Sequence, residues 1–223
     1  MVYASANAFK TKFFDLHLGS NGIGIKSIEE VVDDFEHLIK NHSNVTDIHK
    51  YVDEMMQSLS KFKGGAFGME ILRGLPPSLS GKTLSRFEAS IDDIDELVGG
   101  CRFDMKFTDG SSSIFVETKN YLKSSISSIV AKPDFLNQFK AYIAEINSID
   151  DMKYFFRSNE GVTKIFLKGK FKTMISNNSD LIFNQMNSSL KQSLELTGLT
   201  AKSKFELLIS NTNSDLYKFI EIN

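Results

Sequence analysis

Cysteine, tryptophan and long apolar runs are nearly or wholly missing from this sequence. One of its 223 residues is cysteine and none is tryptophan. The single Cys101 excludes a disulfide within the chain and a cysteine-cluster metal site, and we expect it to be a small residue at a strand end. No stretch approaches the roughly 18 consecutive apolar residues of a membrane-spanning helix. Residues 1–20 also lack the basic segment and apolar run of a signal peptide, so we expect a soluble protein.

A strong net charge is lacking as well. Lysines and arginines number 26 and acids 28, a formal net charge of −2, which argues against a protein that coats nucleic acid. The charges are nevertheless unevenly placed, because residues 27–59 are acidic whereas basic residues outnumber acids from 119 to 172. This asymmetry favours an anionic partner for the second half of the chain, and ordinary solvated helix faces are the alternative.

The early part of the chain has the pattern of two helices. Ser27 followed by Glu30 is a capping-box signature, and apolar residues then recur at helical spacing over 28–39. The polar residues 41–44 interrupt the pattern, so the acidic stretch is predicted to form two helices. We therefore interpret residues 1–61 as a helical N-terminal extension that precedes a domain over 62–223.

Helical and alternating patterns follow one another in the middle of the chain. The predicted order is a helix (62–75), a strand (83–91), a turn or short helical insert (92–100), a hairpin (101–107 and 113–119), a polar link (120–133), a helix (134–147) and a strand (151–158). This order indicates the α/β class. The prediction is a small mixed β-sheet flanked by helices, with the helical extension ahead of it.

The predicted hairpin carries charged residues between its apolar ones. With a two-residue loop at Gly110-Ser111, Asp104 lies opposite Glu117, and the Cβ atoms of such a pair are about 5 Å apart. Two carboxylates in this position repel each other unless a positive charge lies between them. Mg²⁺, which binds one or two carboxylates together with water and phosphate, would supply that charge. Lys119 points to the same place, and neutralisation of the pair by Lys119 alone is the alternative.

The spacing of these charged residues resembles a nuclease signature. Asp104, followed after thirteen residues by Glu117-Thr118-Lys119, is similar to the split Asp…Glu-x-Lys motif of the PD-(D/E)xK nuclease superfamily. The motif falls on a predicted hairpin, as the family requires, although Phe103 stands where many members have proline. The resemblance covers residues 64–157 and implies a restriction-endonuclease-like core.

Two neighbouring helices add to the resemblance. Gln138 and Tyr142, on the helix after the hairpin, look like the Q-x-x-x-Y element of several branches of the superfamily, and they share one side of that helix. The resemblance implies that they reach toward the site or the phosphate backbone, and a core position is the alternative for Tyr142. Glu70, on the helix before the hairpin, lies where members often supply an additional acid. Glu88 is a second candidate for that role.

The resemblance implies metal-dependent hydrolysis of phosphodiester bonds. Asp104, Glu117 and the backbone carbonyl of Thr118 would hold Mg²⁺, with Mn²⁺ or Zn²⁺ as alternatives. Lys119 would orient or help to deprotonate the attacking water and stabilise negative charge on the phosphate. The predicted catalytic residues are therefore Asp104, Glu117, Lys119, Glu70, Gln138 and Tyr142.

The implied substrate is nucleic acid, with DNA favoured over RNA because the superfamily favours it. No sequence-reading module is evident, so we expect cleavage with little sequence preference. A small core behind a helical extension looks like the toxin domains of bacterial polymorphic toxin systems, which implies an immunity protein as partner and delivery to the cytoplasm of a target cell. The alternatives are a restriction or repair endonuclease, a nuclease that cleaves tRNA or other RNA, and a non-catalytic module that binds nucleic acid on the same fold.

Overall fold

The chain adopts a mixed α/β fold, in which helices accompany a mixed sheet of five strands. The computed structural model describes residues 6–20, 24–90, 102–158 and 161–223. The predicted insert (92–100) and Cys101 lie outside these described residues. Among the helices that are described, none is both long enough and apolar enough to cross a membrane.

The chain divides into two compact units. The first consists of Met1–Ala89, Phe103–Tyr121 and Asn223, and the second of Ser90–Arg102 and Leu122–Ile222. The first unit thus combines the predicted helical extension with most of the charged hairpin. The predicted domain boundary after residue 61 stays a prediction, and so does the restriction-endonuclease-like core.

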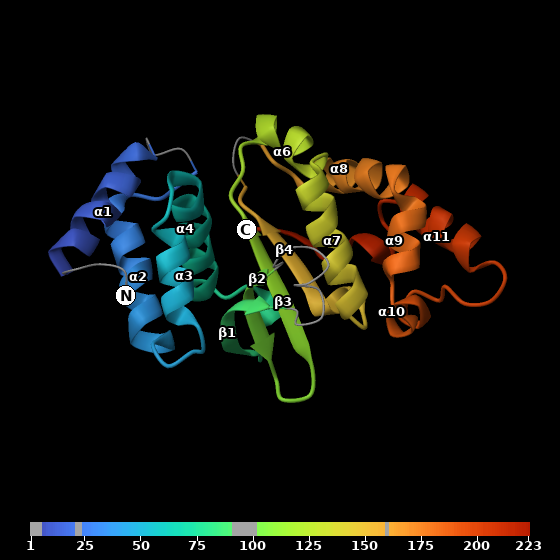
Figure 1. Ribbon diagram of the computed structural model, residues 1–223, viewed down its shortest axis with the longest axis horizontal. Coiled ribbons are helices and arrows are strands. Elements are labelled where there is room, and N and C mark those ends of the chain that lie inside the picture. The colour runs from blue at the N-terminus through green and yellow to red at the C-terminus, as the bar shows by residue number, and fades with distance from the viewer. Residues whose placement is uncertain (1–5, 21–23, 91–101, 159–160) are drawn as a thin grey trace. The chain divides into compact units, whose positions relative to one another are not determined.

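Helices α1 to α4 make up much of the first unit (Figure 1). They are α1 (Ala6–Gly19), α2 (Ile28–His42), α3 (Ile48–Met55) and α4 (Leu59–Arg73), followed by the short 3-10 helix η1 (Pro77–Leu79). The capping box predicted at the start of α2 is confirmed. Glu30 N–H donates to Ser27 Oγ at 3.3 Å, and Ser27 N–H donates to Glu30 Oε2 at 3.1 Å. These two bonds satisfy backbone donors that the first turn of a helix leaves without partners.

The hairpin has the predicted strands and register. After β1 (Thr83–Ser90) come β2 (Arg102–Thr108) and β3 (Ser113–Lys119). The last two pair antiparallel, with Met105 opposite Val116, in the register that the sequence predicts. Residues 109–112 connect the two strands, and among them Gly110 adopts a positive φ of 90°, which glycine tolerates at no steric cost.

Burial along the hairpin alternates in β2 and does not alternate in β3. In β2 the apolar residues are buried and the polar residues between them are more exposed. In β3, three consecutive residues, Val116, Glu117 and Thr118, are 0%, 1% and 7% exposed. Both faces of β3 are therefore buried near its end, and one of the buried side chains is an acid.

Helix α4 packs against α1, α2, α3 and β3. Glycines in its sequence permit this close approach. A Cβ atom at Gly65 would lie 2.4 Å from Met55 Cγ, and one at Gly68 would lie 2.2 Å from Tyr51 Oη. Because real Cβ atoms do not make contacts this short, both positions favour glycine even though glycine weakens a helix.

The second unit consists of helices around aromatic side chains and two parallel strands. Its elements are α6 (Lys123–Val130), α7 (Pro133–Glu145), η2 (Ile149–Asp151), β4 (Met152–Phe156), α8 (Lys164–Asn177), α9 (Ser179–Gln185), α10 (Ser188–Ser193), α11 (Ala201–Ser210), η3 (Asp215–Tyr217) and β5 (Ile220–Ile222). Strands β4 and β5 pair in parallel, with Tyr154 opposite Ile220. The rings of Phe139, Phe171 and Phe219 lie 5.1 to 6.0 Å apart between centroids and form part of the core.

Helix α6 occupies the segment predicted as a polar link (120–133), so that part of the prediction is wrong. Ile126 and Val130, four residues apart, are buried, and α6 contacts α7 and α8. The sequence of α6 contains three apolar residues, Ile126, Ile129 and Val130, among four serines and a lysine, and this serine-rich composition favours a link over a helix. Packing of Ile126 and Val130, rather than intrinsic propensity, stabilises this short helix. The helix and strand predicted after the link are confirmed as α7 and β4.

Candidate active site

Asp104 is bound by the strand that carries the other residues of the predicted motif. Its Oδ2 accepts hydrogen bonds from Thr118 N–H and from Thr118 Oγ1, both at 2.7 Å. Continuing the hairpin register by one pair sets Asp104 opposite Glu117, so the carboxylate reaches one residue further along β3. Hydrogen bonds to an ionised acceptor are short and strong. Thr118 therefore holds the Asp104 carboxylate in place.

Glu117 and Lys119 form a buried ion pair. Their side chains are 1% and 11% exposed, and Lys119 Nζ lies 2.7 Å from Glu117 Oε2. Burial opposes the charged form of Lys119, but the carboxylate of Glu117, together with Tyr121 and Asp104, raises the pKa of Lys119 above its usual value. A buried acid is costly unless it is paired. Asp104, Glu117 and Lys119, the charged trio, are thus an interdependent group.

A tyrosine that no sequence pattern singled out lies near Thr118. Tyr51, on α3, is buried, and its hydroxyl donates to a backbone carbonyl of α4 at 2.8 Å. Burial raises the pKa of Tyr51 well above its usual value, and the negative charges of Asp104 and Glu88 raise it further. A Cβ atom at Gly68 would lie 3.7 Å from Thr118 Oγ1 as well as close to Tyr51. In the sequence, Tyr51 is one apolar residue of a short helix, and nothing there distinguishes it.

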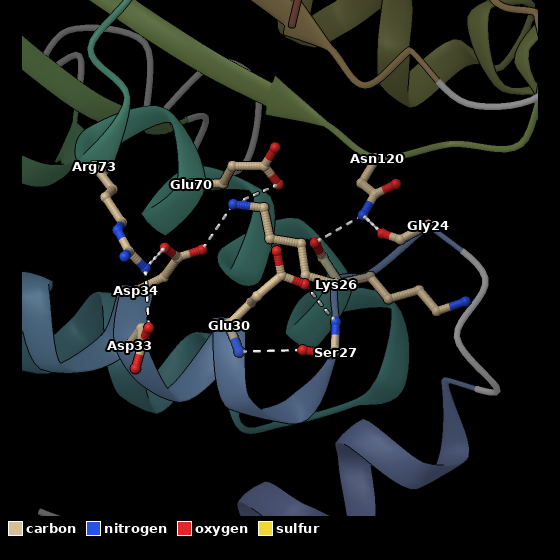
Figure 2. A network of polar contacts seen from close by, with 10 residues as sticks. Gly24, Lys26, Ser27, Glu30, Asp33, Asp34, Glu70, Arg73 and Asn120 are labelled. Carbon is tan, nitrogen blue, oxygen red and sulfur yellow. Dashed lines mark hydrogen bonds and ion pairs between the residues drawn. The ribbon is translucent and has the colours of Figure 1, made fainter.

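The two candidates for the additional acid have different surroundings. Glu70 Oε2 lies 3.8 Å from Lys26 Nζ, which also contacts a second, buried carboxylate (Figure 2). Glu88 lies in β1 with a φ of 45°, a left-handed conformation that is uncommon for residues other than glycine. Its charge acts on the Tyr51 hydroxyl, as that of Asp104 does. Of the two candidates, therefore, Glu88 is the one whose charge, like that of Asp104, raises the pKa of the Tyr51 hydroxyl.

The ion pairs around Glu70 belong to the helical part of the first unit. Asp34, which is 1% exposed, accepts hydrogen bonds from Lys26 Nζ at 3.3 Å and from Arg73 Nη1 at 3.0 Å. Arg73 also contacts the exposed Asp33 at 3.6 Å. Figure 2 shows that this network joins α2 and α4 to the segment that precedes α2. Two basic partners explain how the buried carboxylate of Asp34 is tolerated.

Gln138 and Tyr142 lie in the second unit, on α7. Gln138 Nε2 donates to Tyr142 Oη at 2.8 Å, and Tyr142 Oη donates to the backbone carbonyl of Arg102 at 2.7 Å. Tyr142 is 0% exposed, so it occupies the core position that was its alternative. The pair holds the first residue of β2, which precedes Asp104 by two positions in the sequence. A catalytic role for Gln138 or Tyr142 stays a prediction.

The described part of the chain contains no cluster of three or more His, Cys, Asp or Glu that could hold a metal ion. Mg²⁺ needs fewer protein ligands than such a cluster supplies, because it keeps several waters and binds through one or two carboxylates. The carboxylate oxygens of Asp104 and Glu117, with the backbone carbonyl of Thr118, the residue after Glu117, are donors of that kind. This donor set suits Mg²⁺ better than Zn²⁺, which is bound mainly by nitrogen and sulfur.

Comparison of the chain with models of protein families found no match. No curated protein and no solved structure matched it either. A functional assignment therefore depends on the charged trio and on the residues that contact it.

Proposed function

We propose that this protein is a Mg²⁺-dependent nuclease that hydrolyses phosphodiester bonds. The observation that carries the proposal is the arrangement near the end of the hairpin, where Thr118 binds the carboxylate of Asp104 and its two neighbours, Glu117 and Lys119, form a buried ion pair. A solvated hairpin face is the competing explanation, and an acid that is 1% exposed argues against it. Buried, interacting charges of this kind are typical of sites where charged groups perform chemistry.

Asp104, Glu117 and the backbone carbonyl of Thr118 are the groups that would hold the metal ion. Bound there, Mg²⁺ would lower the pKa of a coordinated water and offset negative charge on the phosphate. Thr118 would keep the Asp104 carboxylate directed toward β3 through its two hydrogen bonds. Lys119 places an ammonium group beside Glu117, where it would donate to a phosphate oxygen or orient the attacking water.

Glu88 is the additional acid that the surroundings favour. Its charge acts on Tyr51 alongside that of Asp104, whereas Glu70 contacts Lys26. A left-handed backbone at a glutamate costs roughly 1–3 kcal/mol, and such strain is concentrated at functional sites. Comparison of E88Q with E70Q decides between the two acids. We expect the larger loss of cleavage in E88Q, and a larger loss in E70Q would reverse the assignment.

The proposed substrate is nucleic acid, with DNA ahead of RNA. Basic residues outnumber acids between residues 119 and 172, and lysines there would contact phosphates without reading bases. Cleavage would then show little sequence preference. The resemblance to bacterial toxin domains adds an immunity protein as a proposed partner and the cytoplasm of a target cell as the proposed place of action.

Cleavage assays with plasmid, linear DNA and tRNA test the proposal. Purified protein incubated with Mg²⁺ should degrade at least one of these substrates, and EDTA should abolish the degradation. The substrate that is degraded identifies the target. If none of the three is degraded with Mg²⁺ or with Mn²⁺, the catalytic proposal is refuted and a binding module becomes the better account.

Replacement of Lys119 tests the site itself. K119A should lower the cleavage rate by orders of magnitude, because it removes an interaction needed mainly in the transition state. It should also lower the free energy of unfolding by about 3–5 kcal/mol, since Glu117 is left buried without its cation. Added Mg²⁺ should raise the melting temperature of K119A at least as much as that of the parent.

The matched control is K106A. Lys106 lies on the same hairpin, and its Nζ sits over the ring of Phe115 at 5.3 Å from the centroid, a contact outside the charged trio. K106A should cleave at the parent's rate. Cleavage by K119A at the parent's rate, measured below the melting temperature of the variant, would contradict the assignment of Lys119.

A further inference from the structure

Asn120 follows Lys119 directly and joins the end of β3 to the helical part of the first unit. Its Nδ2 donates to the backbone carbonyl of Lys63 at 3.0 Å and to that of Gly24 (Figure 2). The side-chain amide therefore contacts two separate segments, one in α4 and one between α1 and α2. The contact with Gly24 joins residues 96 positions apart in the sequence.

The two carbonyls are themselves held in place. Lys63 is part of α4, which packs against three other helices and β3. Gly24 begins the segment Gly24–Ser27, in which the side chain of Ile25 is buried and that of Lys26 contacts two carboxylates. The same segment ends at the residue that caps α2. Asn120 is thus tied to well-anchored parts of the helical region.

The contacts of Asn120 affect the position of Lys119, the last residue of β3. The backbone direction after a residue helps to determine where its side chain points. Lys119 has to keep its Nζ 2.7 Å from Glu117 in a largely buried space. Asn120 is uncharged and lies outside the charged trio, so its contribution to the trio is geometric.

We propose that Asn120 is a positioning residue for Lys119, and that the helical part of the first unit thereby completes the active site. This inference rests on the proposed nuclease function. A side-chain amide suits the task because its NH₂ group can donate two hydrogen bonds. An ionised aspartate has nearly the same shape but no N–H, and it would place a negative charge against two carbonyl oxygens.

N120D tests the inference, and N187D is its matched control. Asn187, in the second unit, also donates from Nδ2 to two backbone carbonyls, those of Ala144 at 2.9 Å and Ile146 at 3.0 Å. The two substitutions remove the same kind of contact and introduce the same repulsion, and N187D keeps the further bond in which Asn187 Oδ1 accepts from Leu190 N–H at 2.8 Å. N120D should lower kcat by roughly 10- to 100-fold, the effect of a small displacement of a catalytic group, with KM nearly unchanged. N187D should lose thermal stability and keep the parent's kcat.

A second measurement is independent of cleavage. The ¹⁵Nζ NMR signal of Lys119, assigned by its loss in K119A, reports directly on the ammonium group beside Glu117. It should be the same in the parent and in N187D, and shifted or broadened in N120D. N120A, which removes the two hydrogen bonds without adding a charge, should show the same change to a smaller extent and serves if N120D does not fold.

The outcomes separate the two proposals. A parent protein that cleaves no nucleic acid refutes the proposed function, and the Lys119 signal still decides whether Asn120 positions that side chain. An unchanged signal in N120D and N120A overturns the positioning role. A kcat in N120D equal to that of N187D overturns it as well.

Discussion

Gly68 is the position in α4 where one added methyl group should have the largest effect. A Cβ atom there would lie 2.2 Å from Tyr51 Oη and 3.3 Å from Tyr51 Cζ. The tyrosine ring has little room to move aside, because it is 3% exposed and packs 4.7 Å from the ring of Phe87 between centroids. Its hydroxyl also binds the carbonyl of Gly65 at 2.8 Å. G68A therefore forces either Tyr51 or α4 to shift.

The size of the effect of G68A follows from three contributions. Overpacking of a core costs about 1–3 kcal/mol, and loss of the Tyr51 hydrogen bond costs about 1 kcal/mol. Alanine in place of glycine in a helix interior stabilises the helix by about 1 kcal/mol. We therefore expect G68A to lower the free energy of unfolding by about 1–3 kcal/mol.

G64A is the matched control for this substitution. Gly64 lies on the same helix, and an added Cβ atom there would have nothing within 4 Å. Only the gain in helix propensity remains, so G64A should raise the free energy of unfolding by about 1 kcal/mol. The two alanine substitutions, four residues apart, are thus expected to have opposite signs.

Urea unfolding of the parent, G64A, G68A, Y51F and the double variant Y51F/G68A measures these effects. Y51F removes the Oη atom that the new Cβ would meet, so G68A should cost less in the Y51F background than in the parent. A double-mutant cycle isolates this coupling. Equal effects of G64A and G68A, or strict additivity of Y51F and G68A, would refute the packing argument.

Three further predictions concern charged residues. D34N should lower the free energy of unfolding by about 1–3 kcal/mol, because it leaves two basic side chains beside a buried neutral group. D33N, at the exposed neighbour, should change the free energy of unfolding by less than about 0.5 kcal/mol. Urea unfolding of the two variants measures the difference. Lys82 holds the pKa of Asp109 well below its usual range, so the contribution of Asp109 is present at neutral pH and is lost below about pH 4, and the stability gap between parent and D109N should shrink on acidification. DNA binding in EDTA should weaken steeply with salt, because lysines between 119 and 172 release counterions, and a flat salt titration would contradict that expectation.

The hairpin shows how much of the fold follows from local sequence signals. Alternating apolar residues and a turn built around glycine predict its strands and its register, and both are confirmed. Such signals act between residues that are close in sequence. Helix α6 was mispredicted because its composition is rich in serine, whereas its stability depends on packing of the buried Ile126 and Val130 in a helix that contacts α7 and α8.

At the site, the sequence identified the charged trio but not its environment. The spacing of Asp104, Glu117 and Lys119 is a property of the chain, whereas the burial of Glu117 depends on elements that cover both faces of β3. Tyr51 and Asn120 were missed for the same reason. Their contacts connect segments that no periodic pattern relates, and Asn120 binds a carbonyl 96 positions away.

That 96-residue separation between Gly24 and Asn120 imposes an order of events during synthesis. Ribosomes add about 5–20 residues per second, so roughly 5–20 seconds pass between the two residues. During this interval α1 to α4 have been made, while the strand that carries Glu117 and Lys119 is still being added. The carbonyls of Gly24 and Lys63 lack the Asn120 amide as a partner until the hairpin has been added. The contacts that Asn120 makes with the helical part of the first unit can therefore form only after the hairpin has been synthesised.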